Sequence, residues 1–235
     1  MEWRKTALME WRKTASMDYK DIDTLLDEGE GFQVEFKRKV STAEKIARTL
    51  IAFANTKGGT IVFGVDDDKS IVGVDSEKAE IEMIQTAGGF LCDPPIEMQV
   101  DIIPYRGKDV VAVTVEESKV KPHYLVGKAN GSDDADSKVL IRVKDKTVIA
   151  SKEVIRILEA ENPEAPPLRI AIGEVERRLL DHLDKSDRIT VKEFSKLVNI
   201  SHRRASRTLI QLVRAGVLRI HTHEKEDFYT LAFDQ

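Results

Sequence analysis

The sequence predicts an α+β fold for most of the chain, followed by a smaller domain of three helices and a β-hairpin. Up to residue 161, expected strands and helices mix without a regular β-α-β alternation. The stretch NPEAPPLR at 162–169 then carries three prolines in five residues, which end a helix and stiffen a linker. Beyond this stretch the pattern changes to amphipathic helices, so we expect a domain boundary here.

Alternating apolar residues predict the strands of the first domain, and helical spacing of apolar residues predicts its helices. Ser41 or Thr42 is placed to cap the second helix. The expected helices are DYKDIDTLLDEGE (18–30), 42–55, 76–86 and SKEVIRILEAE (151–161). The expected strands are FQVEFK (32–37), TIVFGV (60–65), SIVGV (70–74), EMQVDIIP (97–104), DVVAVTV (109–115) and a hairpin over KVLIRVKDKTVIA (138–150) that turns at 144–146.

The C-terminal part predicts three helices and then a hairpin. The helices are IGEVERRLLDHLDK (172–185), ITVKEFSKLVN (189–199) and SHRRASRTLIQLVRAG (201–216), and the hairpin strands are VLRIHTH (217–223) and FYTLAF (228–233). Thr190 and Ser201 are suited to cap the second and third helices, and Gly216 to stop the third. This order of elements is typical of a winged helix-turn-helix domain.

These boundaries divide the chain into four parts. MEWRKTA at 1–7 recurs at 9–15, so 1–16 is a duplicated segment, which we interpret as a start-site duplication or an artificial addition and leave out of the fold. If ordered, it is expected to form a helical extension. Residues 17–161 form the mixed domain, 162–169 the proline-rich linker and 170–235 the winged helix-turn-helix domain.

Composition excludes several classes of protein. The single cysteine, Cys92, excludes a disulfide framework and a cysteine-based zinc finger, and it fits a cytoplasmic location. No apolar run approaches the ~18 residues that a membrane span needs. The net charge is −4, but residues 169–235 alone carry 13 Lys and Arg against 10 Asp and Glu. This asymmetry hints at a part of the chain that faces nucleic acid.

The third helix of the C-terminal domain and its first hairpin strand carry the sharpest local charge bias. From Asn199 to His223 there are five arginines, three histidines and no acid. Leu209, Leu212 and Val213 form an apolar stripe with Ala205, and the arginines fall largely off it. A recognition helix needs such a division between an apolar and a polar face. The expected base-reading residues are Ser201, His202, Arg203, Arg204 and Arg207, and the expected phosphate contacts are Arg214, Arg219 and His221. A solvated basic face on a protein-interaction domain is the alternative.

The stretch FANTKGGTIVFGVDDD at 53–68 is not a Walker phosphate loop. That loop joins a strand to a helix and ends in Gly-Lys-Ser/Thr, whereas here the order is helix to strand and Lys57 precedes the glycines. ATP binding is therefore given little weight. Asn55 can end the helix, Gly58 and Gly59 can turn the chain, and the aspartates fit a polar turn.

Residues 18–160 nevertheless resemble the Schlafen-type Alb-like domain. The stretches that carry the resemblance are VEFKRK, AFANTKGGTIVFGVDDDKSIVGVD, KPHY at 121–124 and VLIRVKDKTVIASKEVIRIL. The resemblance implies a nucleic-acid-binding module of the kind found in predicted prokaryotic regulators, which the family also pairs with a C-terminal winged helix.

The same resemblance implies a second activity, because some animal Schlafen proteins are RNA endonucleases with three metal-binding carboxylates. The matching positions are Glu30, Glu35 and Asp67, with Asp66 beside the last, and Lys37 is placed to steady a phosphate. Mg²⁺ or Mn²⁺ would be the cofactor. The animal nucleases use two copies of the domain and a zinc site, whereas this chain has one copy and one cysteine.

We therefore expect a cytoplasmic DNA-binding protein, acting as a transcriptional regulator and a homodimer, with RNA as a second nucleic-acid partner to test. No cofactor is expected for such a DNA-binding protein. A metal-dependent endoribonuclease is the alternative, and an adaptor that binds only protein is a third class.

Overall fold

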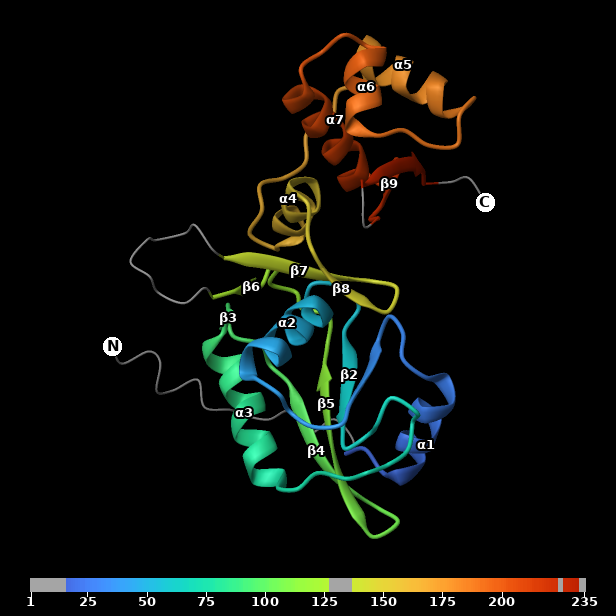
Figure 1. Cartoon of the computed structure of the whole chain (residues 1–235). Helices are drawn as coiled ribbons and strands as arrows, with labels where there is room; N and C mark the ends of the chain where they lie inside the picture. Colours follow the sequence, from blue (N-terminus) through green and yellow to red (C-terminus); the bar gives the residue numbers. More distant parts are fainter. Residues whose placement is uncertain (1–15, 127–136, 224–225, 233–235) are drawn as a thin grey trace, which may run out of the picture.

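The fold was taken from a computed structural model that describes residues 16–126, 137–223 and 226–232. The duplicated segment 1–16 lies outside the described residues except for Ser16. The chain forms a mixed α/β unit followed by three helices and a hairpin (Figure 1), which confirms the predicted fold class.

Most of the predicted elements are present. The helices are α1 (Tyr19–Glu28), α2 (Ala43–Ala54), α3 (Glu77–Phe90), α4 (Lys152–Glu161), α5 (Glu174–Leu183), α6 (Val191–Leu197) and α7 (His202–Arg214). The strands are β1 (Val34–Lys37), β2 (Gly59–Phe63), β3 (Cys92–Asp93), β4 (Gln99–Tyr105), β5 (Lys108–Val115), β6 (Tyr124–Leu125), β7 (Lys138–Val143), β8 (Lys146–Ile149), β9 (Leu218–His221) and β10 (Phe228–Leu231). Thr42, Thr190 and Ser201 cap α2, α6 and α7 with their side chains.

The larger part contains two four-stranded sheets. The first has the order β1-β2-β5-β4, in which β1 and β2 are parallel and the other pairs antiparallel. The second has the order β3-β6-β7-β8 and is antiparallel. Helix α2 lies between the two sheets (Figure 1), and eight of its residues are buried. A helix covered on both sides explains the nearly continuous apolar run of IARTLIAFA.

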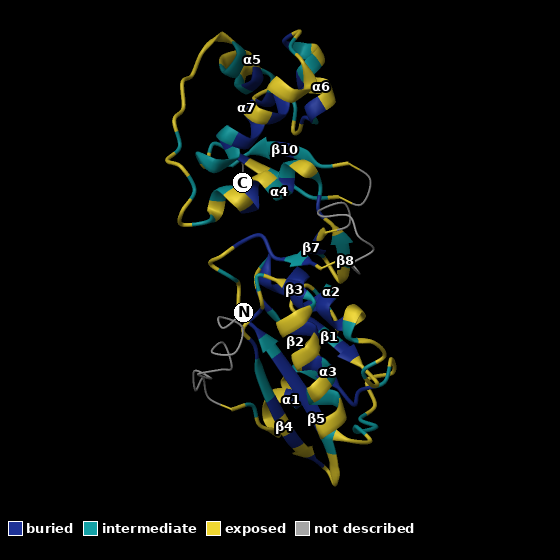
Figure 2. Cartoon of the chain, turned by 90° about the vertical axis from the view of Figure 1, so that its left-hand side faces the viewer, coloured by how far each residue is buried: buried dark blue, intermediate teal, exposed yellow. Residues whose placement is uncertain are grey.

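The central strands β2 and β5 of the first sheet are buried on both faces. On one face, side chains of β2 and β5 pack against α2 and α3, with Leu50, Phe53 and Ile84 fully buried. On the other face, Val62 and Ala112 pack against Ile22 of α1. The buried strands form a dark band along the lower part of Figure 2.

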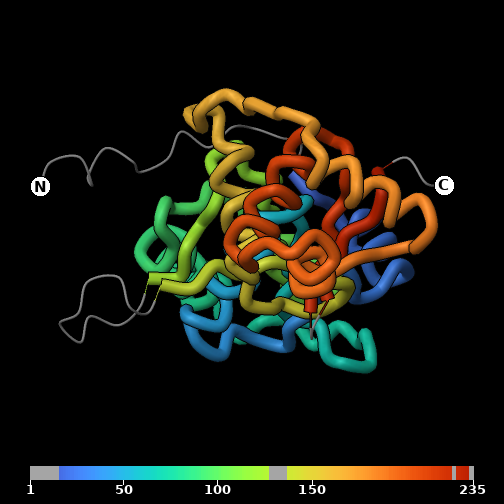
Figure 3. Tube along the Cα trace, turned by 90° about the horizontal axis from the view of Figure 1, so that it is seen from above, coloured from blue at the N-terminus to red at the C-terminus, as the bar shows by residue number. Residues whose placement is uncertain are grey.

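The C-terminal elements enclose a separate apolar core. Leu179 of α5, Phe194 of α6, Leu209 of α7 and Tyr229 of β10 are all fully buried in it. Ile189 bridges to Tyr229 and so extends the β9–β10 hairpin beside α6. Seen from above, these elements lie over the mixed α/β part (Figure 3), with α4 next to α7.

Two local predictions were wrong. The segment SIVGV is not a strand, because it makes only one isolated bridge, Val65 to Ile71, and Gly73 has a φ of 78°. Helix α3 runs to Phe90 rather than to residue 86. The helix passes through Gly88 and Gly89 in spite of their low helix propensity. A Cβ on Gly88 would lie 2.4 Å from the Cε of Met98, the movable end of that side chain, whereas Gly89 has open space around it.

Among the described residues, no helix combines the length and apolar character that crossing a bilayer requires.

Candidate nucleic-acid interface

Helix α7 has two different faces. Ser201 accepts a hydrogen bond from the backbone N–H of Arg204 (3.3 Å), which fixes the start of the helix. Ala205, Leu209 and Leu212 are buried in the C-terminal core. The exposed residues of α7 are all arginine or histidine, and none is acidic. They are His202, Arg203, Arg204 and Arg207. The helix therefore presents positive charge on a rigid element.

Two of the other predicted DNA contacts, Arg214 and His221, already have partners within the protein. Arg219 is exposed on β9. Arg214 is partly buried and donates to the backbone carbonyl of Pro166 (3.1 Å) in the linker. His221 stacks on Phe228 with ring centroids 4.8 Å apart, and its Nε2 lies 2.9 Å from the Thr230 hydroxyl. Burial and the neighbouring Arg219 lower the pKa of His221, so it is neutral at pH 7.

A second basic surface lies between β1, the first turns of α2 and the β7–β8 hairpin. We call it the basic hollow, and it consists of two adjoining cavities of about 190 and 240 Å³ that share Lys37, Lys45 and Thr49. Its charged lining residues are Lys37, Lys39, Lys45, Arg48 and Arg142 against Glu35 and Asp145. A concave surface with an excess of one charge concentrates the field on that side of the protein.

Glu35 lies in the basic hollow and is neutralised there. Its Oε2 is 2.6 Å from Nη1 of Arg142, and its Oε1 is 2.7 Å from Nζ of Lys37. The side chain of Arg142 is 1% exposed, and its Cζ lies 5.1 Å from the centroid of the Phe53 ring. It also donates to the Gly31 carbonyl (2.6 Å). This ion pair joins β1 of the first sheet to β7 of the second.

The remaining predicted carboxylates are dispersed. Glu30 accepts a hydrogen bond from the Phe36 amide (2.9 Å), and Asp66 pairs with Arg38 (2.5 Å). Asp67 is exposed beside Asp66. Within the described ranges, no three His, Cys, Asp or Glu side chains lie close enough together to hold one metal ion. The metal-binding roles predicted for Glu30, Glu35, Asp66 and Asp67 stay predictions.

The polar turn after β2 has a structural role. Lys69 has a φ of 66° and donates from Nζ to the carbonyl of Leu26 (2.9 Å) near the end of α1. Asp68 accepts from the Ser70 amide (2.8 Å). Because carbonyls at a helix C-terminus lack partners in the helix, a lysine there is stabilising. The turn thus connects α1 to the first sheet.

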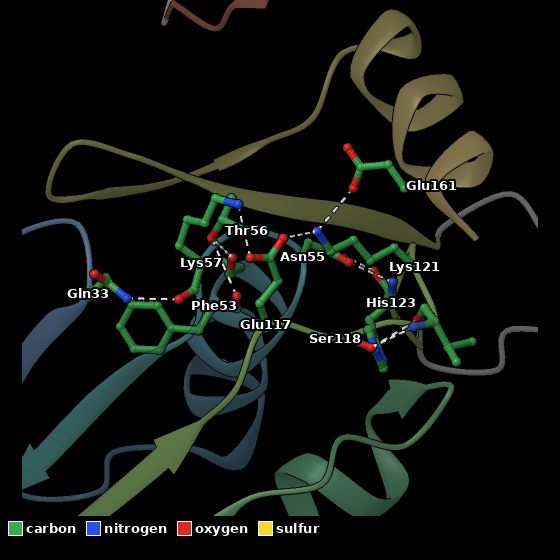
Figure 4. Close-up of polar contacts among 12 residues, drawn as sticks. Gln33, Phe53, Asn55, Thr56, Lys57, Glu117, Ser118, Lys121, His123 and Glu161 are labelled. Atoms are coloured by element: carbon green, nitrogen blue, oxygen red, sulfur yellow. Dashed lines mark hydrogen bonds and ion pairs between the residues drawn. The ribbon is translucent and has the colours of Figure 1, made fainter. Parts of the chain in front are cut away.

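The family-like motifs AFANTKGG and KPHY meet in a buried polar network (Figure 4). Asn55 accepts from the His123 amide (2.8 Å) and donates to the carbonyls of His123 and Leu140 (3.0 Å each). Lys121 pairs with Glu117 (2.7 Å) and with Glu161 at the end of α4 (3.1 Å). The two motifs therefore hold α2, the second sheet and α4 together.

The double glycine of the same motif makes a tight turn from α2 into β2. Gly58 has a φ of 70°, and a Cβ there would lie 2.5 Å from the carbonyl oxygen of Val115. A Cβ on Gly59 would lie 2.6 Å from the carbonyl oxygen of Gln33. Since the backbone needs both glycines for space, and Gly58 also for its φ, the turn requires no phosphate to explain it.

His123 gives the network a dependence on pH. Its Nδ1 donates to the Pro94 carbonyl (2.7 Å), so its Nε2 accepts from the Ser118 hydroxyl (2.7 Å) in the neutral form. Burial is the main cause that lowers the pKa of His123 below its ordinary value. Between that lowered pKa and about 6.5 the unfolded chain binds more protons than the folded one, so stability falls as pH decreases.

We expect the free energy of unfolding to decline below about pH 6.5, with a contribution from His123 of at most about 1.4 kcal/mol per pH unit, the limit for one proton. Urea unfolding of the wild type and of His123→Gln between pH 5 and 8 measures this contribution as the difference in pH slope. His202→Gln, at an exposed position, is the control. Equal slopes for the wild type and His123→Gln would contradict the assignment.

Several of these residues were not predicted. No pattern in the sequence indicated that Lys39, Lys45, Arg48 and Arg142 form part of one surface. For Arg142 a signal existed, because an arginine inside the apolar strand KVLIRV is buried only if it has a partner. The lysines carry no such signal, since exposed lysines are common at any surface.

The chain thus belongs to the class of proteins that join a mixed α/β domain to three helices and a β-hairpin, the order of elements of a winged helix-turn-helix. The Schlafen, AlbA_2 family model matches residues 30–151, more than half of the chain, and the chain belongs to this family. No curated protein sequence matches it.

Two solved structures are similar to parts of the chain. The N-terminal domain of a RecG-related protein from Nitrosomonas europaea is 21% identical, with a TM-score of 0.36 over 52% of this chain and 94% of that one. The DIP2311 protein from Corynebacterium diphtheriae is 16% identical, with a TM-score of 0.42 over 63% of this chain and 34% of that one. This chain therefore spans about a third of the DIP2311 protein.

Proposed function

We propose that this chain is a DNA-binding protein that reads duplex DNA with α7 and acts as a transcriptional regulator. The observation that carries the proposal is the exposed face of α7. Arg203, Arg204 and Arg207 project from a helix whose other face is held in the C-terminal core. Clustered arginines without acids repel one another unless a polyanion faces them, and a rigid helix with such a face fits the major groove.

The basic hollow supports a second nucleic-acid contact from the Schlafen domain. Its lysines and arginines outnumber its acids, and they come from a strand, a helix and a hairpin that are packed together. A homodimer, as expected from the sequence, would present two such hollows and two recognition helices. In this proposal residues 17–161 are the Schlafen domain, 162–169 the linker and 170–235 the DNA-reading domain.

The ion pairs of Glu35 favour DNA binding over metal-dependent RNA cleavage. Both of its carboxylate oxygens face cations, and Asp66 is paired with Arg38. A carboxylate that neutralises Arg142 in the protein core has a structural reason to be present. Binding of nucleic acid therefore accounts for the basic surfaces without a chemical step.

One titration tests the proposal. Fluorescence anisotropy with a duplex DNA and a folded RNA, each with and without Mn²⁺, is followed by a gel of the same samples. We expect salt-sensitive binding of duplex DNA, with log Kd rising by about 0.9 per phosphate contact for each tenfold increase in salt, and intact RNA on the gel. Mn²⁺-dependent RNA fragments that disappear in Glu35→Gln would favour the metal-dependent endoribonuclease over the DNA-binding protein. Absence of binding to either nucleic acid at physiological salt would favour the adaptor.

A further inference from the structure

Helix α4 covers a flank of α7 that the C-terminal core leaves open. Ser206 and Ile210 of α7 are 1% and 7% exposed, yet neither belongs to the apolar core of the C-terminal elements. They lie one turn apart on the same side of the helix. Helix α4, the last helix before the linker, packs against α7 (Figures 1 and 2).

Polar contacts hold this packing in one arrangement. The Ser206 hydroxyl donates to Oε1 of Glu153 on α4 (2.7 Å), and Nη1 of Arg156 donates to the Ser206 oxygen (3.3 Å). At the start of α4, the Ser151 hydroxyl donates to Asp227 beside β10 (2.5 Å). Helix α4 is therefore attached to both the recognition helix and the wing.

Apolar packing accompanies the polar contacts. Ile220 of β9 packs on the cluster that contains Val154 and Leu158 of α4. An interface that combines apolar packing with hydrogen bonds restricts rotation of the C-terminal domain on its linker.

Arg156 is exposed at the edge of this contact. Its neighbour Ser206 lies three residues after Arg203 and one before Arg207, and both of these arginines are exposed. Within the part of the chain that the structure describes, Glu153 is hydrogen-bonded to Ser206, and no carboxylate lies within ion-pair distance of Arg156. The exposed acids of α4 are Glu159, about one turn further along the helix, and Glu161, which pairs with Lys121. Arg156 thus adds a positive charge beside the basic face of α7.

We propose that the DNA-binding surface is composite, with α4 of the Schlafen domain contributing Arg156 as a phosphate-contacting residue next to the recognition helix. The inference rests on the proposed function. The major groove is about 12 Å wide, and a helix with its side chains is about 10–12 Å wide, so one helix fills it. A second helix packed at the flank of α7 would then lie at the border of the groove, where the phosphates are.

Two substitutions separate the charge of Arg156 from its hydrogen bond. Arg156→Gln removes the charge and keeps a donor for Ser206, whereas Arg156→Lys keeps the charge. Binding of duplex DNA by the full chain is measured between 50 and 200 mM salt. For Arg156→Gln we expect a slope of log affinity against log salt that is shallower by about 0.9, the value for one phosphate contact. The affinity advantage of the wild type over this variant would fall about 3.5-fold across that range. Arg156→Lys should keep the wild-type slope.

Arg106→Gln, in the exposed β4–β5 turn, is the matched control and Arg203→Ala the reference for the recognition helix. An unchanged slope for Arg156→Gln would overturn the inference, and tighter binding would overturn it by showing that α4 shields α7. If Arg203→Ala weakens binding and Arg156→Gln leaves the slope unchanged, only the composite surface fails. If the wild type does not bind duplex DNA, both the proposed function and the composite surface fail.

Discussion

Replacing Arg203 and Arg207 together by alanine is expected to weaken binding of duplex DNA by about 30-fold or more. Both side chains are exposed on α7, one turn apart, and neither lies in the C-terminal core. Each lost base contact is worth about 1–3 kcal/mol, and 1.4 kcal/mol corresponds to a factor of ten in Kd. Fluorescence anisotropy at a fixed salt concentration measures the change.

A pair of arginines elsewhere supplies the control. Arg177 on α5 and Arg106 in the β4–β5 turn are exposed, and their replacement by alanine removes the same net charge. Exposed substitutions of this kind leave stability within about 0.5 kcal/mol, so all variants should remain folded. Equal affinities for the two double variants would remove α7 from the interface and favour a protein partner for its basic face.

Replacing Arg142 by methionine is expected to lower the free energy of unfolding by about 3 kcal/mol. The substitution leaves Glu35 in the interior without its main partner, and breaking a buried ion pair from one side costs about 3–5 kcal/mol. Lys37 still faces Glu35 at 2.7 Å and is partly exposed, which favours the lower end of that range. Urea unfolding measures the loss.

A second substitution tests whether the loss comes from the uncompensated charge. Adding Glu35→Gln to Arg142→Met should recover part of the stability, because the glutamine carries no charge. The coupling between the two positions is the readout, and contacting residues typically couple by about 0.5–3 kcal/mol. Arg48→Met, in the same basic hollow, is the control. If Arg142→Met lost no more stability than Arg48→Met, the ion pair would not be the connection between the sheets.

Local features of the chain were predictable because they depend on neighbours in sequence. The caps at Thr42, Thr190 and Ser201 are examples, since each accepts a hydrogen bond from an amide three residues ahead. The division of α7 into an apolar and a basic face likewise follows from helical periodicity. The predicted β7–β8 hairpin was confirmed, since Leu140–Val143 pairs antiparallel with Lys146–Ile149.

Long-range features were not predictable from one sequence. Glu35 and Arg142 are separated by 107 positions, and nothing near Glu35 indicates that an arginine will neutralise it. Helix α3 continues through Gly88 and Gly89 although glycine has a low helix propensity. The covering of Ser206 by α4 depends in the same way on how two separate units meet. The predicted roles of Glu30, Glu35, Asp66 and Asp67 in metal binding stay predictions.

The contact between α4 and α7 separates two tasks that a linker usually combines. Residues 162–173 tether the C-terminal domain and so set its effective concentration near α4, whereas the interface sets its orientation. Doubling the length of a flexible tether costs only about 0.6 kcal/mol. A longer tether would therefore leave the orientation of the C-terminal domain to the α4–α7 interface, although the hydrogen bond from Arg214 to the Pro166 carbonyl also ties the tether to α7.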